Sequence, residues 1–468
     1  MIIEQIYTGC LAQGAYYIES NGEVAIIDPL REVQDYLDRA AKKNAKIKYI
    51  FETHFHADFV SGHVTLAEKT GGKIVFGPNA KTKFDSHIAK DGEVFKLGNI
   101  TITVLHTPGH TMESTTYLLK DENGKDHAIF TGDTLFLGDV GRPDLAQKSD
   151  VTQDDLAAIL FDSLRNKIMT LADDVLVYPA HGAGSACGKN LSKETIGTLG
   201  EQKATNYALR PDMTKEEFVK EVTAGLLPPP AYFPLNVMLN KEGYQSIDDV
   251  IETGTRALSV KDFELIANET DALILDVRHQ SKFIKGFIPQ SIFIGLGGTF
   301  APWVGALVKD IKQPILLVVP EGKAEETITR LSRVGFDNVL GYLEGGFDAW
   351  KASGKDIDTL TSVSADVLEQ KINEEALVFD VRKPGEYAAE HIENVSSTPL
   401  DFLNDHISEF PTNKDFYVHC AGGYRSVIAS SILKARGFNK VIDVAGGYAA
   451  IRETGIKRTD VVSCSSSK

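Results

Sequence analysis

A short segment of the chain concentrates side chains that bind metal ions. Residues 53–59 read Thr-His-Phe-His-Ala-Asp-Phe, so that His54, His56 and Asp58 fall within five positions. Imidazole and carboxylate groups are the ligands that a divalent transition metal needs. The last residue of the segment, Phe59, carries a hydrocarbon ring that cannot coordinate a cation. The segment therefore predicts a metal site from which one potential ligand is missing.

Three further segments carry the same kinds of side chain. His110 lies in Thr-Pro-Gly-His-Thr, Asp133 in Thr-Gly-Asp-Thr and His181 in Tyr-Pro-Ala-His-Gly, and each segment follows a predicted strand. A glycine beside a ligand lets the backbone come close to a bound ion. Taken singly, each segment is also explained as a capped turn, since Asp and His are common in loops. Together, they predict that loops at strand ends converge on one metal centre.

A potential nucleophile lies in residues 418–426, Val-His-Cys-Ala-Gly-Gly-Tyr-Arg-Ser. The pattern predicts that Cys420 ends a strand and enters a glycine-rich loop that leads into a helix. Backbone N–H groups in such a loop stabilise an anion, here a thiolate or a bound persulfide, and Arg425 adds a positive charge. The alternative is a buried structural cysteine beside a turn. We expect Cys420 and Arg425 to be catalytic, and the loop residues to contact the substrate: Gly422, Gly423 and Tyr424.

The elements that must position the metal ligands are of the α/β kind. Residues 24–29 and 100–105 read as strands that end in polar loops, and residues 33–43 show a helical pattern. Such alternation is typical of a layered α/β fold with its site at the loop rim. Residues 227–234, Leu-Pro-Pro-Pro-Ala-Tyr-Phe-Pro, fit neither a helix interior nor a central strand, and we expect them to end this part.

The rest of the chain contains an internal repeat. Residues 273–278, Leu-Ile-Leu-Asp-Val-Arg, match residues 377–382, Leu-Val-Phe-Asp-Val-Arg, and Gly-Phe-Asp-Asn-Val at 335–339 matches Gly-Phe-Asn-Lys-Val at 437–441. A unit of about a hundred residues is domain-sized, so the repeat predicts a duplicated small domain with a parallel sheet covered by helices. The expected domains are residues 1–245, 255–357 and 360–460.

Composition indicates a globular protein. At 468 residues the chain is too long for one core, and 43% of its residues are hydrophobic. The net charge of −16 argues against nucleic acid or an anionic membrane as a partner. No apolar run approaches the roughly 20 residues of a membrane span, and the N-terminal residues lack the features of a signal peptide. With four widely spaced cysteines, the cytoplasm is the expected location.

The order His-x-His-x-Asp, Pro-Gly-His, Gly-Asp and Pro-Ala-His resembles the metallo-β-lactamase superfamily over roughly the first half of the chain. The resemblance implies an αββα sandwich that usually holds two metals, with a histidine where this chain has Phe59. Within the superfamily, the chain is similar to the persulfide dioxygenases. That similarity implies one Fe(II) per chain, held by His54, His110 and Asp133, which is a ligand set of mononuclear iron oxygenases. Three residues would then support these ligands or form a weak second metal site: His56, Asp58 and His181.

Two residues near these ligands are expected to face the substrate. The stretch 138–144 resembles a segment that borders the site in the persulfide dioxygenases, which implies that Arg142 contacts the substrate. Cys187 lies in the glycine-rich loop after His181. We expect it either to face the substrate or simply to pack within its loop.

The segment around Cys420 resembles the rhodanese sulfurtransferases, in which this cysteine accepts a sulfane sulfur and passes it to a nucleophile. The resemblance implies two small rhodanese-like α/β domains with parallel sheets. In the first of them, Pro320 or Glu321 is expected where the second has Cys420. With no thiol, the first domain is expected to lack transferase activity.

Together these resemblances imply a fused enzyme. Iron would oxidise a low-molecular-weight thiol persulfide with O₂ to sulfite, and Cys420 would transfer sulfur so that sulfite becomes thiosulfate. Glutathione, coenzyme A and bacillithiol all stay open as the carrier thiol, and the oligomeric state stays open, a homo-oligomer included. Zinc is the alternative metal, as in a glyoxalase II-like thioester hydrolase fused to a sulfurtransferase. A second alternative is a non-enzymatic protein for sulfur relay or docking.

Overall fold

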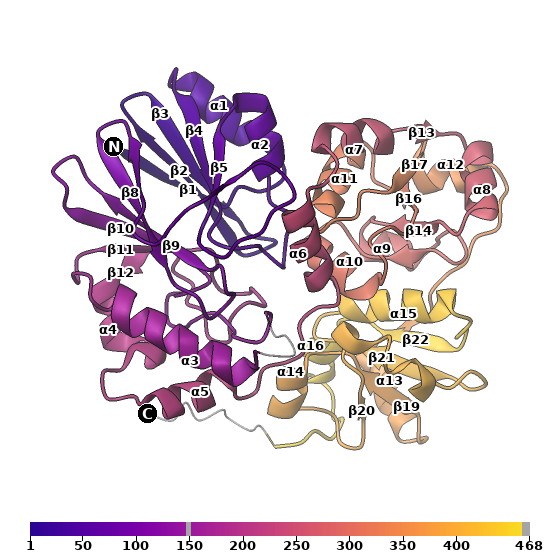
Figure 1. The fold of residues 1–468 in the computed structure, drawn as a ribbon. Coiled ribbons are helices and arrows are strands. Elements are labelled where there is room, and N and C mark those ends of the chain that lie inside the picture. Colours follow the sequence, from indigo (N-terminus) through magenta and orange to yellow (C-terminus); the bar gives the residue numbers. More distant parts are fainter. Residues whose placement is uncertain (147–150, 461–468) are drawn as a thin grey trace. The chain divides into compact units, whose positions relative to one another are not determined.

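The computed structural model describes residues 1–146 and 151–460. These residues form two compact units, one of Met1–Ile247 with the short segment Ser332–Gly335, and one of the remaining described chain (Figure 1). The first unit holds two six-stranded sheets, and the second holds two five-stranded sheets. None of the described helices is long and apolar enough to cross a membrane.

The first sheet of the first unit is mixed. Its strands lie in chain order: β1 (Ile2–Thr8), β2 (Gln13–Ser20), β3 (Glu23–Ile27), β4 (Lys46–Phe51), β5 (Lys73–Phe76) and β6 (His87–Ile88). The first three strands pair antiparallel and the others pair parallel. The strand predicted at 24–29 is β3, which ends earlier because Asp28 takes a left-handed backbone conformation with φ of 50°.

The second sheet is mixed as well. It runs in the order β12 (Gly197–Thr198), β11 (Leu176–Pro179), β10 (Asp126–Gly132), β9 (Thr115–Lys120), β8 (Ile100–His106) and β7 (Val94–Leu97). Its helices are α3 (Gln153–Ser163), α4 (Leu199–Thr205) and α5 (Lys215–Thr223). The helix α6 (Phe233–Glu242) begins inside the proline-rich segment 227–234, with Pro234 in its first turn, where proline is tolerated. The strand predicted at 100–105 is therefore confirmed as β8.

Buried side chains of both sheets meet in one core, which shows that the sheets stack face to face. Tyr16 and Phe51 of the first sheet and Tyr117 and Phe130 of the second belong to this cluster. The outer face of the first sheet packs on α1 (Gln34–Lys42) and α2 (His63–Thr70), and that of the second packs on α3 and α5 (Figure 1). The first unit is therefore an αββα sandwich, as predicted.

The second unit contains the predicted duplication. Its first half contains these elements: α7 (Ile247–Gly254), β13 (Ala257–Leu258), α8 (Val260–Glu269), β14 (Leu273–Asp276), α9 (Gln280–Phe283), β15 (Ile292–Phe293), α10 (Phe300–Leu307), β16 (Ile315–Val318), α11 (Ala324–Ser332), β17 (Val339–Leu343) and α12 (Gly346–Ala352). The strand order is β13-β17-β16-β14-β15, and all neighbours are parallel.

The second half repeats this order as β18-β22-β21-β19-β20, again all parallel. Its elements are β18 (Ser362–Val363), α13 (Ala365–Ile372), β19 (Leu377–Asp380), α14 (Pro384–Ala389), β20 (Ser396–Ser397), β21 (Phe416–His419), α15 (Arg425–Ala435), β22 (Val441–Val444) and α16 (Gly447–Ile451). The repeated Asp-Val-Arg motif has a structural role, because Arg278 pairs with Asp276, and Arg382 pairs with Asp380, in a buried ion pair at 2.6 Å in each half.

Candidate functional site

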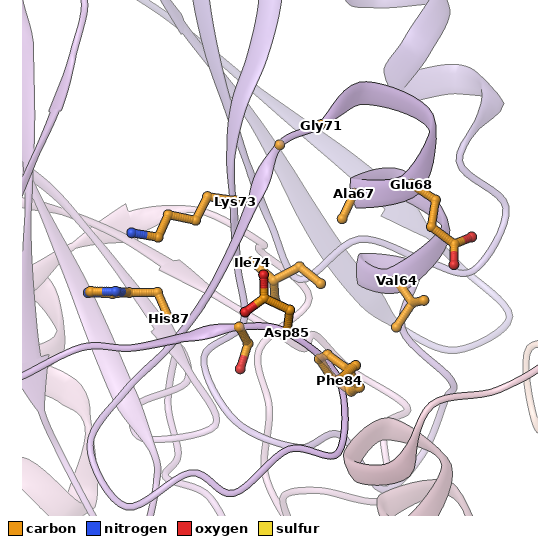
Figure 2. A pocket seen from close by; sticks show the side chains of 11 residues that line it. Val64, Ala67, Glu68, Gly71, Lys73, Ile74, Phe84, Asp85 and His87 are labelled. Carbon is orange, nitrogen blue, oxygen red and sulfur yellow. The ribbon is translucent and has the colours of Figure 1, made fainter.

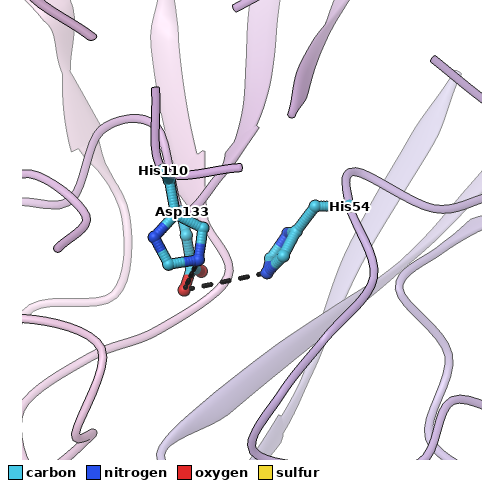
Figure 3. Close-up of side chains that lie close together, drawn as sticks. All are labelled: His54, His110 and Asp133. Carbon is cyan, nitrogen blue, oxygen red and sulfur yellow. Dashed lines mark ion pairs between the residues drawn. The ribbon is translucent and has the colours of Figure 1, made fainter. Parts of the chain in front are cut away.

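Three loops at strand ends bring the predicted metal ligands together. His54 follows β4, His110 follows β8 and Asp133 follows β10, and all three side chains are buried. The Nε2 atom of His110 lies 3.4 Å from Oδ2 of Asp133, and Nε2 of His54 lies 3.9 Å from the same oxygen (Figure 3). The sequence prediction that these segments converge is therefore supported by their geometry.

Hydrogen bonds to the other ring nitrogen orient both imidazoles. Nδ1 of His110 donates to the backbone carbonyl of Arg142 at 2.8 Å. The Thr53 hydroxyl donates to Asp28 at 2.8 Å, so its oxygen is free to accept from Nδ1 of His54 at 3.0 Å. Each imidazole therefore presents the lone pair of Nε2 to Asp133. Such outer partners commonly set the tautomer of metal-binding histidines.

The cluster has the chemistry of a metal site. Among the described residues, neither carboxylate oxygen of Asp133 has a hydrogen-bond partner, although the side chain is buried. A buried carboxylate without a partner is costly, and a cation would satisfy it. Burial, together with the neighbouring His56 and His110, holds the pKa of His54 well below its ordinary value, so its imidazole is neutral and able to bind a metal. The residues present therefore fit a divalent cation.

A second group of potential ligands adjoins the first. Nε2 of His181 lies 3.4 Å from Asp58 and 3.6 Å from the other oxygen of Asp133. Its Nδ1 is bonded to the carbonyl of Ala12 at 3.1 Å, so Nε2 is again the free nitrogen. His181 therefore adjoins both carboxylates, and its ligand atom lies within 4.8 Å of those of His56 and Asp58 in one group and of Asp133 and Cys187 in another.

His56 is oriented differently from the other ligands. Its Nε2 lies 3.1 Å from Asp28 and 3.5 Å from Glu52, and its ring lies on that of Phe59, with 4.3 Å between centroids. Burial alone would lower the pKa of His56, but Asp28 and the other nearby carboxylates raise it to about 9. His56 thus interacts with carboxylates that lie behind the metal cluster, although its ligand atoms remain within 4.8 Å of those of Asp58 and His181.

The carboxylates behind the cluster were missed from the sequence. Asp28 directly follows β3, and Glu52 directly follows β4, so both occupy the strand-end positions that were used to find the ligands. Glu52 also contacts Nδ1 of His63 at 3.0 Å. The position of Asp28 and Glu52 directly after strands is the sequence feature that could have identified them.

Arg142 and Cys187 both lie beside the metal cluster. The guanidinium of Arg142 pairs with Asp144 at 2.6 Å and donates to the carbonyls of Ala186 and Leu227. Its backbone N–H donates to the carbonyl of Cys187 at 3.1 Å. The Cys187 thiol is buried with its sulfur within 4.8 Å of ligand atoms of Asp133, and burial raises its pKa well above the ordinary value. Arg142 therefore ties the Cys187 loop to the segment that holds His110.

A surface pocket of the same unit lies elsewhere. It is bordered by α2, β5 and β6, and Glu68, Lys73, Asp85 and His87 are among its lining residues (Figure 2). None of the clustered ligands lines this pocket. The candidate metal ligands therefore lie in the buried cluster and not in this pocket.

The second unit places Cys420 as the sequence predicts, at the end of β21 in a loop that leads into α15. The backbone N–H of Gly423 donates to the Cys420 sulfur at 3.1 Å, in a left-handed conformation with φ of 90° that favours glycine. Arg425 forms a two-point ion pair with Glu386, at 2.6 and 2.8 Å. The Tyr424 hydroxyl donates to the carbonyl of Gly295 in the first repeat at 2.9 Å.

The first repeat has no thiol at the corresponding place. The backbone N–H of Val277 donates to the carbonyl of Val318, and in the second repeat the backbone N–H of Val381 donates to the carbonyl of His419. These equivalent bonds align Val318 with His419. By this register Val319 stands where the second repeat has Cys420, so the expectation of Pro320 or Glu321 at this place is wrong by one or two residues. Valine offers no sulfur chemistry.

Comparison with known families assigns both units. Residues 8–181 match the model of the metallo-beta-lactamase superfamily. The model of the rhodanese-like domain matches twice, at residues 259–353 and 364–454. The duplicated halves of the second unit are therefore rhodanese-like domains.

Proteins similar to this chain carry names from two chemistries. The mitochondrial persulfide dioxygenase ETHE1 of Homo sapiens is 30% identical over 220 residues, which are 47% of this chain and 78% of that protein. A probable hydroxyacylglutathione hydrolase of Schizosaccharomyces pombe is 31% identical over 188 residues, 39% of this chain and 69% of that protein. A crystal structure of a metallo-beta-lactamase from Staphylococcus aureus is 30% identical with a TM-score of 0.66, covering 73% of this chain and 99% of that one. Overall identity does not separate oxygenation from hydrolysis.

Proposed function

Because this chain belongs to the metallo-beta-lactamase superfamily and carries two rhodanese-like domains, we propose that it is a persulfide dioxygenase coupled to sulfur transfer. In the first reaction, a thiol persulfide, O₂ and water give the thiol, sulfite and two protons. In the second, sulfite takes the outer sulfur from a persulfide on Cys420, which leaves the Cys420 thiolate and thiosulfate. The carrier would be a low-molecular-weight thiol such as glutathione, coenzyme A or bacillithiol.

The arrangement around His54 carries the oxygenase proposal. The Nε2 atoms of His110 and His54 lie 3.4 and 3.9 Å from the same oxygen of Asp133, so two imidazoles and one carboxylate could bind one ion. His56 faces Asp28 at 3.1 Å, and Phe59 covers its ring. One metal with three protein ligands keeps open positions, as in mononuclear iron oxygenases.

The residues of the chain would hold and enclose this centre. His54, His110 and Asp133 would bind Fe(II), which supplies open positions where O₂ and the persulfide sulfur can react. The Thr53 hydroxyl and the Arg142 carbonyl contact Nδ1 of the two histidines, which would leave Nε2 of each free to bind the ion. Burial of these side chains limits the access of water. We propose that the Cys187 thiol and the segment of Arg142 face the bound substrate.

A zinc thioester hydrolase is the second candidate, because one observation favours it. Asp58 and His181 offer ligand atoms for a second cation next to Asp133, at 3.4 and 3.6 Å from Nε2 of His181. A pair of metal ions held by such ligands would activate water for hydrolysis. The similarity to the Schizosaccharomyces pombe hydrolase points in the same direction.

Metal analysis of anaerobically purified protein, combined with O₂ uptake on glutathione persulfide, tests the proposal. We expect about one iron per chain and O₂ consumption that yields sulfite. Cys420→Ser is the matched control, since it should keep O₂ uptake and lose thiosulfate formation. Zinc without O₂ uptake, together with hydrolysis of a glutathione thioester, would favour the hydrolase. Unchanged thiosulfate formation by Cys420→Ser would assign the second unit to relay or docking.

A further inference from the structure

A chain of hydrogen bonds leads from Cys420 into the interior of the second rhodanese-like domain. The Cys420 thiol donates to the hydroxyl of Ser426 at 3.6 Å, and that hydroxyl donates to Oδ1 of Asp443 at 2.6 Å. The exposed fractions of Cys420, Ser426 and Asp443 are 1%, 0% and 2%. The thiol is therefore connected to a carboxylate without passing through bulk water.

Asp443 is an unusual residue for this position. Its other oxygen accepts from the Ser362 hydroxyl at 2.7 Å. Among the described residues, no Lys, Arg or His forms an ion pair with it. Burial raises the pKa of Asp443, and the bonds from Ser426 and Ser362 offset only part of that rise. A buried carboxylate without a cation costs stability, so its presence here calls for a reason.

The first repeat serves as an internal comparison for Asp443. On β22, Asp443 pairs with Val418, two residues before Cys420. On β17, Tyr342 pairs with Leu317, two residues before Val319. Asp443 and Tyr342 therefore occupy the same place in the two sheets. The repeat without a thiol has a tyrosine at this place and no carboxylate.

Both hydroxyl partners of Asp443 are missing from the first repeat as well. Ser362 neighbours Asp443 on β18, and Ala257 neighbours the corresponding residue on β13. Counting back from the matching bonds at the ends of α11 and α15, Ala324 corresponds to Ser426. Thiol, hydroxyls and carboxylate are thus present together in one repeat and absent together from the other. This co-occurrence indicates that the polar chain serves the cysteine.

The other titratable groups around the thiol are held in ion pairs or are buried and neutral. Arg425 is paired with Glu386. His419, next to Cys420 on β21, is buried, and that burial lowers its pKa, so the imidazole is neutral. Asp380 pairs with Arg382 at 2.6 Å and lies 3.8 Å from Nε2 of His419, and Tyr448 of α16 stacks on His419. Ser426 provides the bonded path from the thiol to a proton acceptor.

We propose that Asp443 accepts the proton of Cys420 through Ser426. The S–H bond breaks as its proton passes to the Ser426 oxygen, while the Ser426 proton moves to Oδ1 of Asp443. The Ser426 hydroxyl then donates to the thiolate, which Gly423 also stabilises through its N–H. This inference rests on the proposed sulfur transfer at Cys420. Asp443 is a positioning residue, since it reaches the sulfur only through Ser426.

The relay lets the thiolate form without a change of net charge in a buried pocket. Charge moves from Asp443 to Cys420 and no proton leaves for solvent, so no additional buried charge has to be stabilised. Two groups that share one proton titrate as a pair and not singly. The pair therefore has a thiolate population that stays constant over a range of pH.

Alkylation of Cys420 by iodoacetamide across pH tests this inference in the full chain, with the Cys420 peptide quantified by mass spectrometry. In the unaltered protein the rate should change by less than about threefold between pH 6 and 8, since the pair retains its proton. In Asp443→Asn and Ser426→Ala it should fall about tenfold per pH unit below the thiol pKa, as for an isolated thiol. Ser426→Thr, which keeps the hydroxyl, should restore the flat profile. Ser430→Ala, the same change one turn further along α15, should leave it unaltered.

Two results would overturn the relay. One is a flat profile in Asp443→Asn, and the other is faster alkylation of that variant at every pH, which would show that the carboxylate only opposes the thiolate. If Asp443→Asn fails to fold, the Ser426→Ala and Ser426→Thr pair decides by the same criterion. Alkylation needs no sulfur donor or acceptor. If the alkylation rate of the unaltered protein is flat with pH but the protein forms no thiosulfate, the result counts against the proposed function and not against the relay.

Discussion

Replacing Phe59 by histidine should convert the centre to one that binds two metals. The Phe59 ring is fully buried and lies on His56, beside the group formed by Asp58 and His181. An imidazole at this place would add a further ligand to Asp58, His181 and the shared Asp133. We expect Phe59→His to raise the metal content from one ion to about two per chain.

The effect on stability has a defined size. Without metal, an imidazole in place of a buried phenyl ring leaves a polar group without a partner, and we expect a loss of about 2–3 kcal/mol. For a unit of this size the melting temperature should fall by about 4–12 °C. Metal at a hundred times its Kd returns about 2.7 kcal/mol, enough to restore most of the loss.

Phe55→His is the matched control, because Phe55 belongs to the same loop and is similarly buried. Its ring packs on Phe76, with 4.7 Å between centroids, and belongs to the core cluster on the outer face of the first sheet. The control should lose stability that added metal does not restore. Metal content by mass spectrometry and melting curves with and without metal measure both variants. The reasoning fails if Phe59→His keeps one metal and responds to metal no more than Phe55→His.

Three further predictions follow from individual contacts. Thr53→Val removes the acceptor of Nδ1 of His54 and should weaken metal binding by about 10–100-fold, measured by competition with a chelator. Removal of the metal by a chelator should lower the melting temperature of the first unit, because it leaves Asp133 buried without a partner; an unchanged melting curve would argue against a metal there. Burial raises the pKa of Glu386, but the ion pair with Arg425 outweighs it and lowers the pKa below its ordinary value. The pair therefore stabilises the fold above about pH 4 and is lost as pH falls further, so urea denaturation of Glu386→Gln should show a deficit at pH 7 that shrinks under acid conditions.

Much of the fold could be predicted from the sequence. Strands at residues 24–27 and 100–105 and the duplicated Asp-Val-Arg units were visible, because alternating apolar residues and repeated segments are local patterns. The ligands His54, His110 and Asp133 were found for a related reason. Each follows a strand, His54 in the first sheet and His110 and Asp133 in the second, and strand-end loops are where an α/β fold places its site.

Other features could not be predicted, because they depend on contacts between distant segments. Val319, and not Pro320, stands at the place of Cys420, since strand register and not residue spacing decides that alignment. Asp28 and Glu52 were overlooked although they stand at strand ends. Nothing in their local sequence shows that both reach His56.

The sequence by itself determined the kinds of group available to this protein: imidazoles and carboxylates in the first unit, and one thiol in a glycine loop in the second. Only the tertiary structure decided their roles. His56 faces Asp28 at 3.1 Å, and Asp443 reaches Cys420 through Ser426. The physical reason is that the direction of a side chain depends on packing against residues far away in the chain. Residue type sets which bonds are possible, and packing selects which of them form.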